Sequence, residues 1–168
     1  LPLSSTPGVF GGQRHVDAVT VWDRDGAGPL PALVAVAGDF TIAGSVYADR
    51  IAAFNPVTNT WAALGQGLGS QVLALQQLPN GDLVAGGHFG IVRFDGTSWL
   101  PLGNGTPGAV ASLAILPNGD LVAGGAFSTV GGVSANNIAR WNGTNWAALG
   151  VGITGWLAVV RALAVLPN

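Results

Sequence analysis

A segment that recurs along the chain constrains its fold more than any other feature. The clearest copy spans residues 116–150 and begins with LPNGDLVAGG, which also stands at residues 78–87. Its closing pattern is an aromatic residue, Asn or Asp, a turn, then Trp and Leu-Gly. That pattern occurs three times, as FNPVTNTWAALG, FDGTSWLPLG and WNGTNWAALG. Self-similarity of this kind indicates one supersecondary unit that is stacked on copies of itself.

Each repeat contains four segments with the properties of β-strands. The first is an alternating apolar run, which Pro-Asn-Gly-Asp follows in two repeats; Asn-Gly favours a tight hairpin because both residues tolerate a positive φ. The second is a short apolar run that ends in Gly-Gly, which predicts a buried strand with a close neighbour, expected to be an aromatic ring of the next repeat. The fourth carries Trp61, Trp99 or Trp146, which we expect to pack between repeats.

Four short strands in each repeat predict an all-β fold, a β-propeller of four-stranded antiparallel blades. We expect about three complete blades, plus a half-blade at each end. Because a closed ring takes roughly 4–8 blades, further blades from the same or other chains would complete it. The predicted boundaries are 1–15 for the end of a preceding blade, 16–65, 70–103 (shortened by a loop deletion) and 108–150 for the blades, and 157–168 for the first strand of a following blade.

Composition excludes several functional classes. Charged residues make up 8% of the chain, all of them Arg or Asp, and the formal net charge is −2. With no basic stripe, nucleic acid is not an expected partner. The lack of Cys excludes disulfides and thiolate metal sites. The most apolar run, residues 156–166, is too short to span a bilayer as a helix, so no membrane span is expected.

These motifs resemble the kelch repeat, in which a Gly pair ends the second strand, an aromatic residue lies in the third and Trp in the fourth. NPVTNTW at residues 55–61 carries this likeness. The fuller pattern at residues 124–150, GG-x-F-x₃-GG-x₃-NNIARWNG-x₂-W-x₂-LG, is closer to the kelch-like repeats of large secreted or surface bacterial proteins. It is also similar to the ectodomain of the fungal cortical polarity-marker family. The resemblance covers essentially the whole chain and implies an extracellular or cell-surface β-propeller.

Two kinds of propeller enzyme show which residues catalysis on this fold would require. Galactose-oxidase-like copper sites, as the resemblance implies, need Tyr, Cys and His ligands, and this chain has one Tyr, two His and no Cys. Sialidase-like propellers carry Asp-boxes, but FDGTSW at residues 94–99 lacks one residue of such a box. It fits instead a turn in which Asp95 accepts hydrogen bonds from nearby backbone. We therefore predict no catalytic residue, no cofactor and no metal site.

Five residues are candidates for a contact surface. Arg93 and Arg140 share one repeat position and could belong to a ring of cations that binds anionic sugars or carboxylates. The alternative is that they are surface strand residues whose stems cover apolar neighbours. His88 follows a Gly pair, either as a blade-edge side chain or as a contact residue. Trp22 and Trp156 depart from the repeat pattern, so they are candidates for exposed contacts.

Other polar residues have simpler interpretations. Asp25, Asp82 and Asp120 lie in predicted turns; their carboxylates could bind Ca²⁺, but no calcium-loop spacing is present and we interpret them as turn-forming residues. Asn104 and Asn142 each begin an Asn-Gly-Thr glycosylation acceptor sequence. Both lie in predicted turns, and the Pro after Thr106 weakens the first as an acceptor.

The pattern favours a non-enzymatic structural or adhesive repeat module of a secreted or cell-surface protein. Such a module would contact protein or carbohydrate, or would assemble with itself into a homo-oligomer or filament. The alternative is the propeller portion of a larger secreted glycan-active hydrolase or lectin whose active residues lie outside these residues. Fold alone does not decide between these interpretations.

Overall fold

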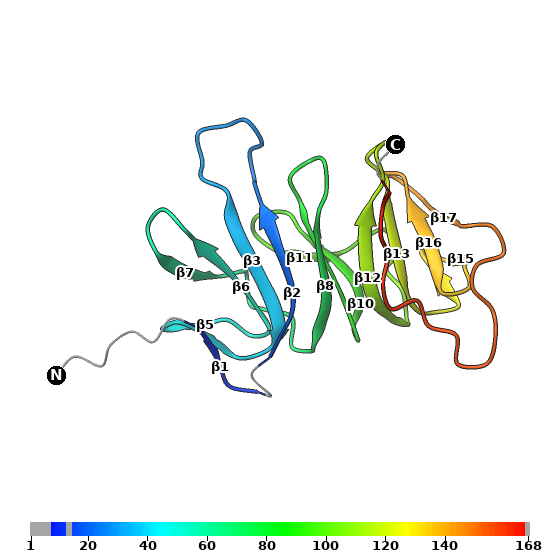
Figure 1. The fold of residues 1–168 in the computed structure, drawn as a ribbon, viewed down its shortest axis with the longest axis horizontal. Helices are drawn as coiled ribbons and strands as arrows, with labels where there is room; N and C mark the ends of the chain where they lie inside the picture. Colours follow the sequence, from blue (N-terminus) through cyan, green and yellow to red (C-terminus); the bar gives the residue numbers. More distant parts are fainter. Residues whose placement is uncertain (1–7, 13–14, 167–168) are drawn as a thin grey trace.

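The computed structural model describes residues 8–12 and 15–166, and all the regular secondary structure there is β-strand. Twelve of the strands form three four-stranded antiparallel sheets that stand side by side (Figure 1). Within each sheet the strands neighbour one another in chain order. The predicted all-β propeller architecture of four-stranded blades is therefore confirmed.

The three sheets are called blades 1, 2 and 3. Blade 1 contains β2 (His15–Trp22), β3 (Leu33–Asp39), β6 (Ile51–Asn55) and β7 (Thr60–Ala63). Blade 2 contains β8 (Val72–Gln77), β9 (Leu83–Gly87), β10 (Gly90–Phe94) and β11 (Trp99–Pro101). Blade 3 contains β12 (Ala109–Ile115), β13 (Leu121–Ala126), β16 (Ile138–Trp141) and β17 (Trp146–Ala148).

The first strands of the blades, β2, β8 and β12, lie next to one another, as Figure 1 shows. Each carries a bulge near its start, between Val16 and Ala18 in β2 and at the matching places in β8 and β12. The same irregularity at the same position in all three strands shows that the repeat extends to the backbone register.

Long loops in blades 1 and 3 form small extra sheets. In blade 1, β4 (Ile42–Ala43) pairs with β5 (Val46–Tyr47) and with β1 (Val9–Phe10). In blade 3, β14 (Thr129–Val130) pairs with β15 (Val133–Ser134). Blade 2, with its nine-residue deletion, turns directly from β9 into β10 at Gly90, whose φ is 93°.

The two predicted end segments differ from the blades. Residues 1–7, 13–14 and 167–168 lie outside the described residues, so the predicted half-blades are described only in part. Val9 and Phe10 pair with the loop of blade 1. Residues 157–166 form no strand, which corrects the expectation of one in this segment. The segment nevertheless lies against β13, because the Val160 N–H donates to the Gly125 carbonyl oxygen at 3.0 Å.

The Gly-Gly pairs allow close approach, but not to the neighbour that the sequence predicts. A Cβ on Gly86 would lie 2.6 Å from Val110 Cγ1 of blade 3, and one on Gly124 would overlap the Val160 side chain. The expected aromatic ring of the next repeat is therefore wrong, and the ring beside Gly87 is Phe89 of the same repeat. The first strand of blade 3 passes directly over Gly86, the segment after blade 3 passes over Gly124, and each places a valine there.

The repeated Trp residues pack at the blade boundaries, as predicted for Trp99 and Trp146. The Trp99 indole N–H donates to the Leu64 carbonyl oxygen of blade 1 at 2.9 Å, and Trp146 donates in the same way to Leu102 of blade 2 at 3.1 Å. Trp61 packs in a smaller cluster within blade 1. The two larger buried clusters each contain side chains from two neighbouring blades, so the core is continuous across the boundaries.

Candidate functional site: a groove between blades 2 and 3

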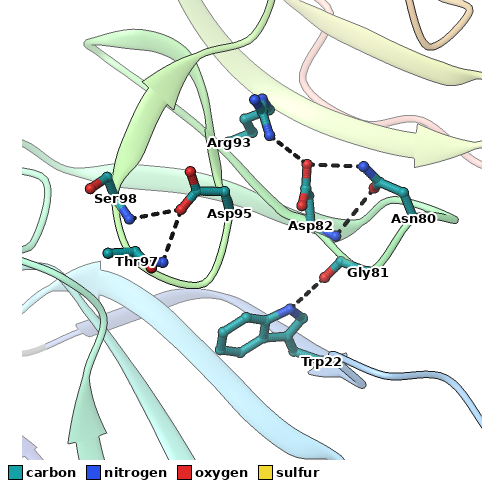
Figure 2. Close-up of polar contacts among 8 residues, drawn as sticks. All are labelled: Trp22, Asn80, Gly81, Asp82, Arg93, Asp95, Thr97 and Ser98. Carbon is teal, nitrogen blue, oxygen red and sulfur yellow. Dashed lines mark hydrogen bonds and ion pairs between the residues drawn. The ribbon is translucent and has the colours of Figure 1, made fainter. Parts of the chain in front are cut away.

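Two hairpin turns with the same sequence stand at the same end of blades 2 and 3. In the first, Asn80 Oδ1 accepts the Asp82 backbone N–H at 3.2 Å, and Asn80 Nδ2 donates to Asp82 Oδ2 at 3.0 Å (Figure 2). Asn118 and Asp120 repeat both bonds in the second, at 3.2 and 2.9 Å. Asp82 and Asp120 are thus turn-forming residues, as the sequence predicts.

Each of these turns also holds an arginine from the third strand of its own blade. Arg93 Nη1 lies 2.7 Å from Asp82 Oδ2, and Arg140 Nε lies 3.4 Å from Asp120 Oδ2. The register explains the pairing in blade 2, because Arg93 stands opposite Val84, two residues after Asp82. Residues two apart on a strand share a face, so the carboxylate and the guanidinium point to the same side.

Blade 1 lacks both members of this pair. Its register places Ala53 opposite Ala35, and the residue two positions before Ala35 is Leu33. Leu33 and Ala53 are both buried and apolar, with exposed fractions of 7% and 2%. The Asp and the Arg therefore occur together in blades 2 and 3 and are replaced together in blade 1. This co-occurrence is the signal in the sequence from which the pairs could have been predicted.

The predicted ring of cations is not formed by Arg93 and Arg140. Each guanidinium is paired with a carboxylate of its own blade, so the two turns contribute no net positive charge. The aspartates are the better covered partners, at 15% and 14% side-chain exposure against 34% and 43% for the arginines. The arrangement supports the simpler interpretation of these arginines as blade-surface residues, here with a specific anionic partner.

A groove of about 700 Å³ separates the two turns. Both repeat-related turns line it, together with the turn between β16 and β17 at Asn142 and Gly143, and the end of β11. Its lining residues are Leu78, Pro79, Asn80, Asp82, Arg93, Pro101, Leu102, Gly103, Asn118, Gly119, Asp120, Trp141, Asn142 and Gly143. Amide, carboxylate and guanidinium groups thus meet at one blade boundary, with apolar carbon between them. The groove is a candidate binding site of the size that small ligands occupy.

Trp22 is buried, which corrects its prediction as an exposed contact. Only 3% of the residue is exposed, and its indole N–H donates to the Gly81 carbonyl oxygen at 2.8 Å (Figure 2). Its ring also packs edge-on against Phe94, with centroids 5.7 Å apart. Trp22 departs from the repeat because it reaches from blade 1 to the turn of blade 2, where Gly81 approaches with a φ of 90°.

The other two candidate residues lie away from the groove. Trp156 is 95% exposed and belongs to the segment that follows blade 3. His88 is exposed at the tight turn between β9 and β10, where its backbone N–H donates to the Gln71 carbonyl oxygen at 3.4 Å. Neither residue lines the groove. The structure thus brings Arg93 and Arg140 to the polar turns that the sequence interprets as structural, and of the five predicted contact residues only Arg93 lines the groove.

Asp95 forms the turn that the sequence predicts for it. Its Oδ1 accepts the backbone N–H groups of Thr97 and Ser98, each at 2.9 Å (Figure 2). The Ser98 and Thr97 N–H groups, with a smaller contribution from the Arg93 charge, lower the pKa of Asp95 below its ordinary value of 3.8. Asn55 and Asn142 accept equivalent bonds in blades 1 and 3, so a neutral amide serves the same turn.

Within residues 8–12 and 15–166, no three His or Asp side chains gather closely enough to hold a metal ion. The same residues include no helix of the length and apolarity needed to cross a membrane.

Comparison with known families supports the propeller assignment. A family model described as a domain of unknown function (DUF5122) beta-propeller matches residues 116–144. The matched segment contains the Asn118–Asp120 turn, the loop sheet, and β13 and β16, which are two of the four strands of blade 3. Neither a curated protein nor a solved structure gives a significant match to the chain. The sequence match and the blade geometry agree that this is a β-propeller repeat protein.

Proposed function

We propose that this chain is a non-enzymatic structural and adhesive module of an extracellular or cell-surface protein. We further propose that it binds a neutral carbohydrate in the groove between blades 2 and 3. The observation that carries the proposal is a groove of about 700 Å³ whose walls contain two aspartates, Asp82 and Asp120, each paired with an arginine of its own blade.

The chemistry of the groove favours a polyhydroxylated ligand. A carboxylate has about four acceptor positions, and the Asn and Arg partners of Asp82 use only some of them. Amide groups both donate and accept, as sugar hydroxyls do. Asp82, Asp120 and Arg93 line the groove, whereas Arg140 does not, so the groove has no excess of positive charge with which to select an anionic sugar. This is why the proposal names neutral carbohydrate instead of the anionic ligands that a cation ring would bind.

The size of the groove favours a small ligand over a protein surface. Pockets for small ligands typically enclose about 300–1,000 Å³, whereas protein contacts are broader and flatter. The alternative function is that of the propeller portion of a larger secreted lectin or glycan-active hydrolase, whose active residues would lie outside this chain and therefore outside the groove.

A glycan array probed with the full chain tests the proposal, followed by calorimetric titration with the glycan that binds best. Pro101→Arg places a long side chain in the groove and should weaken that binding at least tenfold. Pro56→Arg is the matched control, because Pro56 is exposed in the turn after β6 of blade 1 and does not line the groove.

Two results would overturn the proposal. One is an array on which the chain selects no neutral glycan. The other is a Pro101→Arg variant that binds as well as the Pro56→Arg control. Hydrolysis of a bound glycan by the purified chain would refute the non-enzymatic part of the proposal.

A further inference from the structure

Blade 1 exposes apolar side chains at positions that are buried or partly buried in the other two blades. The start of each first strand is a valine, and Val16 is 42% exposed, whereas Val72 and Val110 are fully buried at 0%. Three residues further along, Val19 is 59% exposed and its equivalent in blade 2, Leu75, is 7% exposed. The described residues provide no blade to cover this surface of β2, which we call the β2 face.

The covered positions show what the β2 face fits. Val72 and Leu75 are buried in a cluster with Ala35 and Ala37 of the preceding blade. Val110 lies against Gly86 of the preceding blade, close enough that a Cβ on that glycine would be 2.6 Å from Val110 Cγ1. The complement of a first strand is therefore the small-residue surface of a second strand from another blade of the same repeat.

Blade 3 offers such a small-residue surface on β13 at Gly124, which we call the Gly124 seat. Gly124 holds the same register position as Gly86. Gly124 stands opposite Ser112, as Gly86 stands opposite Ala74. Val160 lies against Gly124, and its N–H donates to Gly125. The sequence that begins at Val160, VRALAVL, is the repeat equivalent of VDAVTVW at residues 16–22. The Gly124 seat is thus occupied by a segment related to β2.

The segment occupies the seat without becoming part of a sheet. Residues 157–166, at the red end of Figure 1, make no strand pairing. Its apolar side chains remain open to solvent, with Leu157 at 84% and Leu166 at 80% exposure. By contrast, β8 and β12 each pair with the second strand of their own blade, in addition to packing on the blade before. A complete blade would fill this seat with more buried apolar area.

We propose that a second copy of this chain docks its β2 face on the Gly124 seat of blade 3, in place of residues 160–166. The contact would continue the interface that already joins blade 1 to blade 2 and blade 2 to blade 3. Each copy carries both halves of it, so the association is head to tail and closes into a ring or extends into a filament. The inference deepens the proposed structural role and makes no use of the groove.

Sedimentation velocity over a range of concentrations, without added sugar, tests the inference on the full chain. We expect masses that rise with concentration in multiples of the chain mass. Val19→Asp should weaken association at least tenfold, because a desolvated carboxylate would face the seat. Val57→Asp is the control, since Val57 is 75% exposed in the turn after β6 and lies outside the β2 face. Circular dichroism verifies that both variants keep the native fold.

A variant of the seat tests the competition. Val160→Asp should release residues 160–166 from Gly124 and strengthen association severalfold. Unchanged or weaker association of this variant would overturn the inference that a second copy takes the place of residues 160–166. A chain that stays monomeric at every concentration, or a Val19→Asp variant that associates like Val57→Asp, would overturn docking by a second copy. Because association and glycan binding are measured separately, failure of one proposal does not decide the other.

Discussion

The indole Nε1 of Trp146 donates a hydrogen bond to the carbonyl oxygen of Leu102, 3.1 Å away across the boundary between blades 2 and 3. Trp99 and Leu64 make the same bond across the previous boundary. The residue after each leucine is a glycine with a positive φ, and a Cβ on Gly103 would lie 3.1 Å from the Trp146 ring. Each boundary therefore combines a buried polar bond with close packing of an aromatic ring.

Replacing Trp146 with Phe should lower the free energy of unfolding by about 1–3 kcal/mol, because a buried hydrogen bond is lost and the smaller ring leaves a cavity. The Leu102 carbonyl oxygen then keeps only the Gly105 N–H as its donor. Trp146 is 6% exposed, so water cannot readily replace the indole. Urea denaturation followed by circular dichroism measures the change. Trp156→Phe is the control, and at 95% exposure it should change stability by less than about 0.5 kcal/mol. Equal effects of the two changes would contradict this account.

Arg93 and Asp82 should show a measurable coupling in a double-mutant cycle. Arg93→Ala and Asp82→Ala should each destabilise blade 2, and the double variant should cost less than the sum of the two. We expect a coupling of about 0.5–1 kcal/mol, since the pair is partly exposed. Blade 1 shows that the fold accepts an apolar pair here. Strict additivity in urea denaturation would mean that the 2.7 Å contact contributes nothing.

The pH dependence of stability should contain a contribution from Asp95. Its pKa is lowered in the folded chain, so its ionisation adds stability above the ordinary value of 3.8. That stability is lost as the pH falls through 3.8 towards the lower folded-state pKa. Asp95→Asn keeps the turn, as Asn55 and Asn142 do, but does not titrate. The stability difference between the wild type and this variant should therefore fall with pH in that window.

The reverse change provides the matched test of the Asp95 prediction. Asn142→Asp places a carboxylate in the equivalent turn of blade 3, where Thr144 and Asn145 donate their N–H groups. This variant should gain the pH dependence that Asp95→Asn loses. Urea denaturation at a series of acidic pH values measures both. A difference that stays constant across the window would show that the turn does not favour the ionised form.

Gly86→Ala should destabilise the boundary between blades 2 and 3 by about 1–3 kcal/mol through overpacking. The added methyl group would lie 2.6 Å from Val110 Cγ1 and 3.1 Å from the Val110 carbonyl oxygen. The cost should shrink in a Val110→Ala background, where the nearest atom is gone. Thermal or urea denaturation of the single and double variants tests this. An equal loss of unfolding free energy in both backgrounds would mean that the contact with Val110 is not the source of the destabilisation.

Local features of this protein could be predicted from its sequence because they depend on residues a few positions apart. The Asp95 turn uses N–H groups two and three residues away, and the Asn-Gly-Asp turns bond within themselves. Alternating apolar runs determine strands in the same way, since side chains two apart share a face. The repeat then extends each local prediction to every blade, so the blade architecture follows from the sequence.

Contacts between blades depended on the tertiary structure. Trp22 was predicted to be exposed because it departs from the repeat, yet its hydrogen-bond partner is Gly81, 59 residues away in the next blade. The side chain beside Gly86 is Val110 and not the predicted aromatic ring, because the stacking of blades decides which strand passes over that glycine. Sequence alone determined the strands, the turns and the repeat. Which side chains are buried, paired or left open at the β2 face was decided by how the blades stack, because burial depends on neighbours that are remote in the chain.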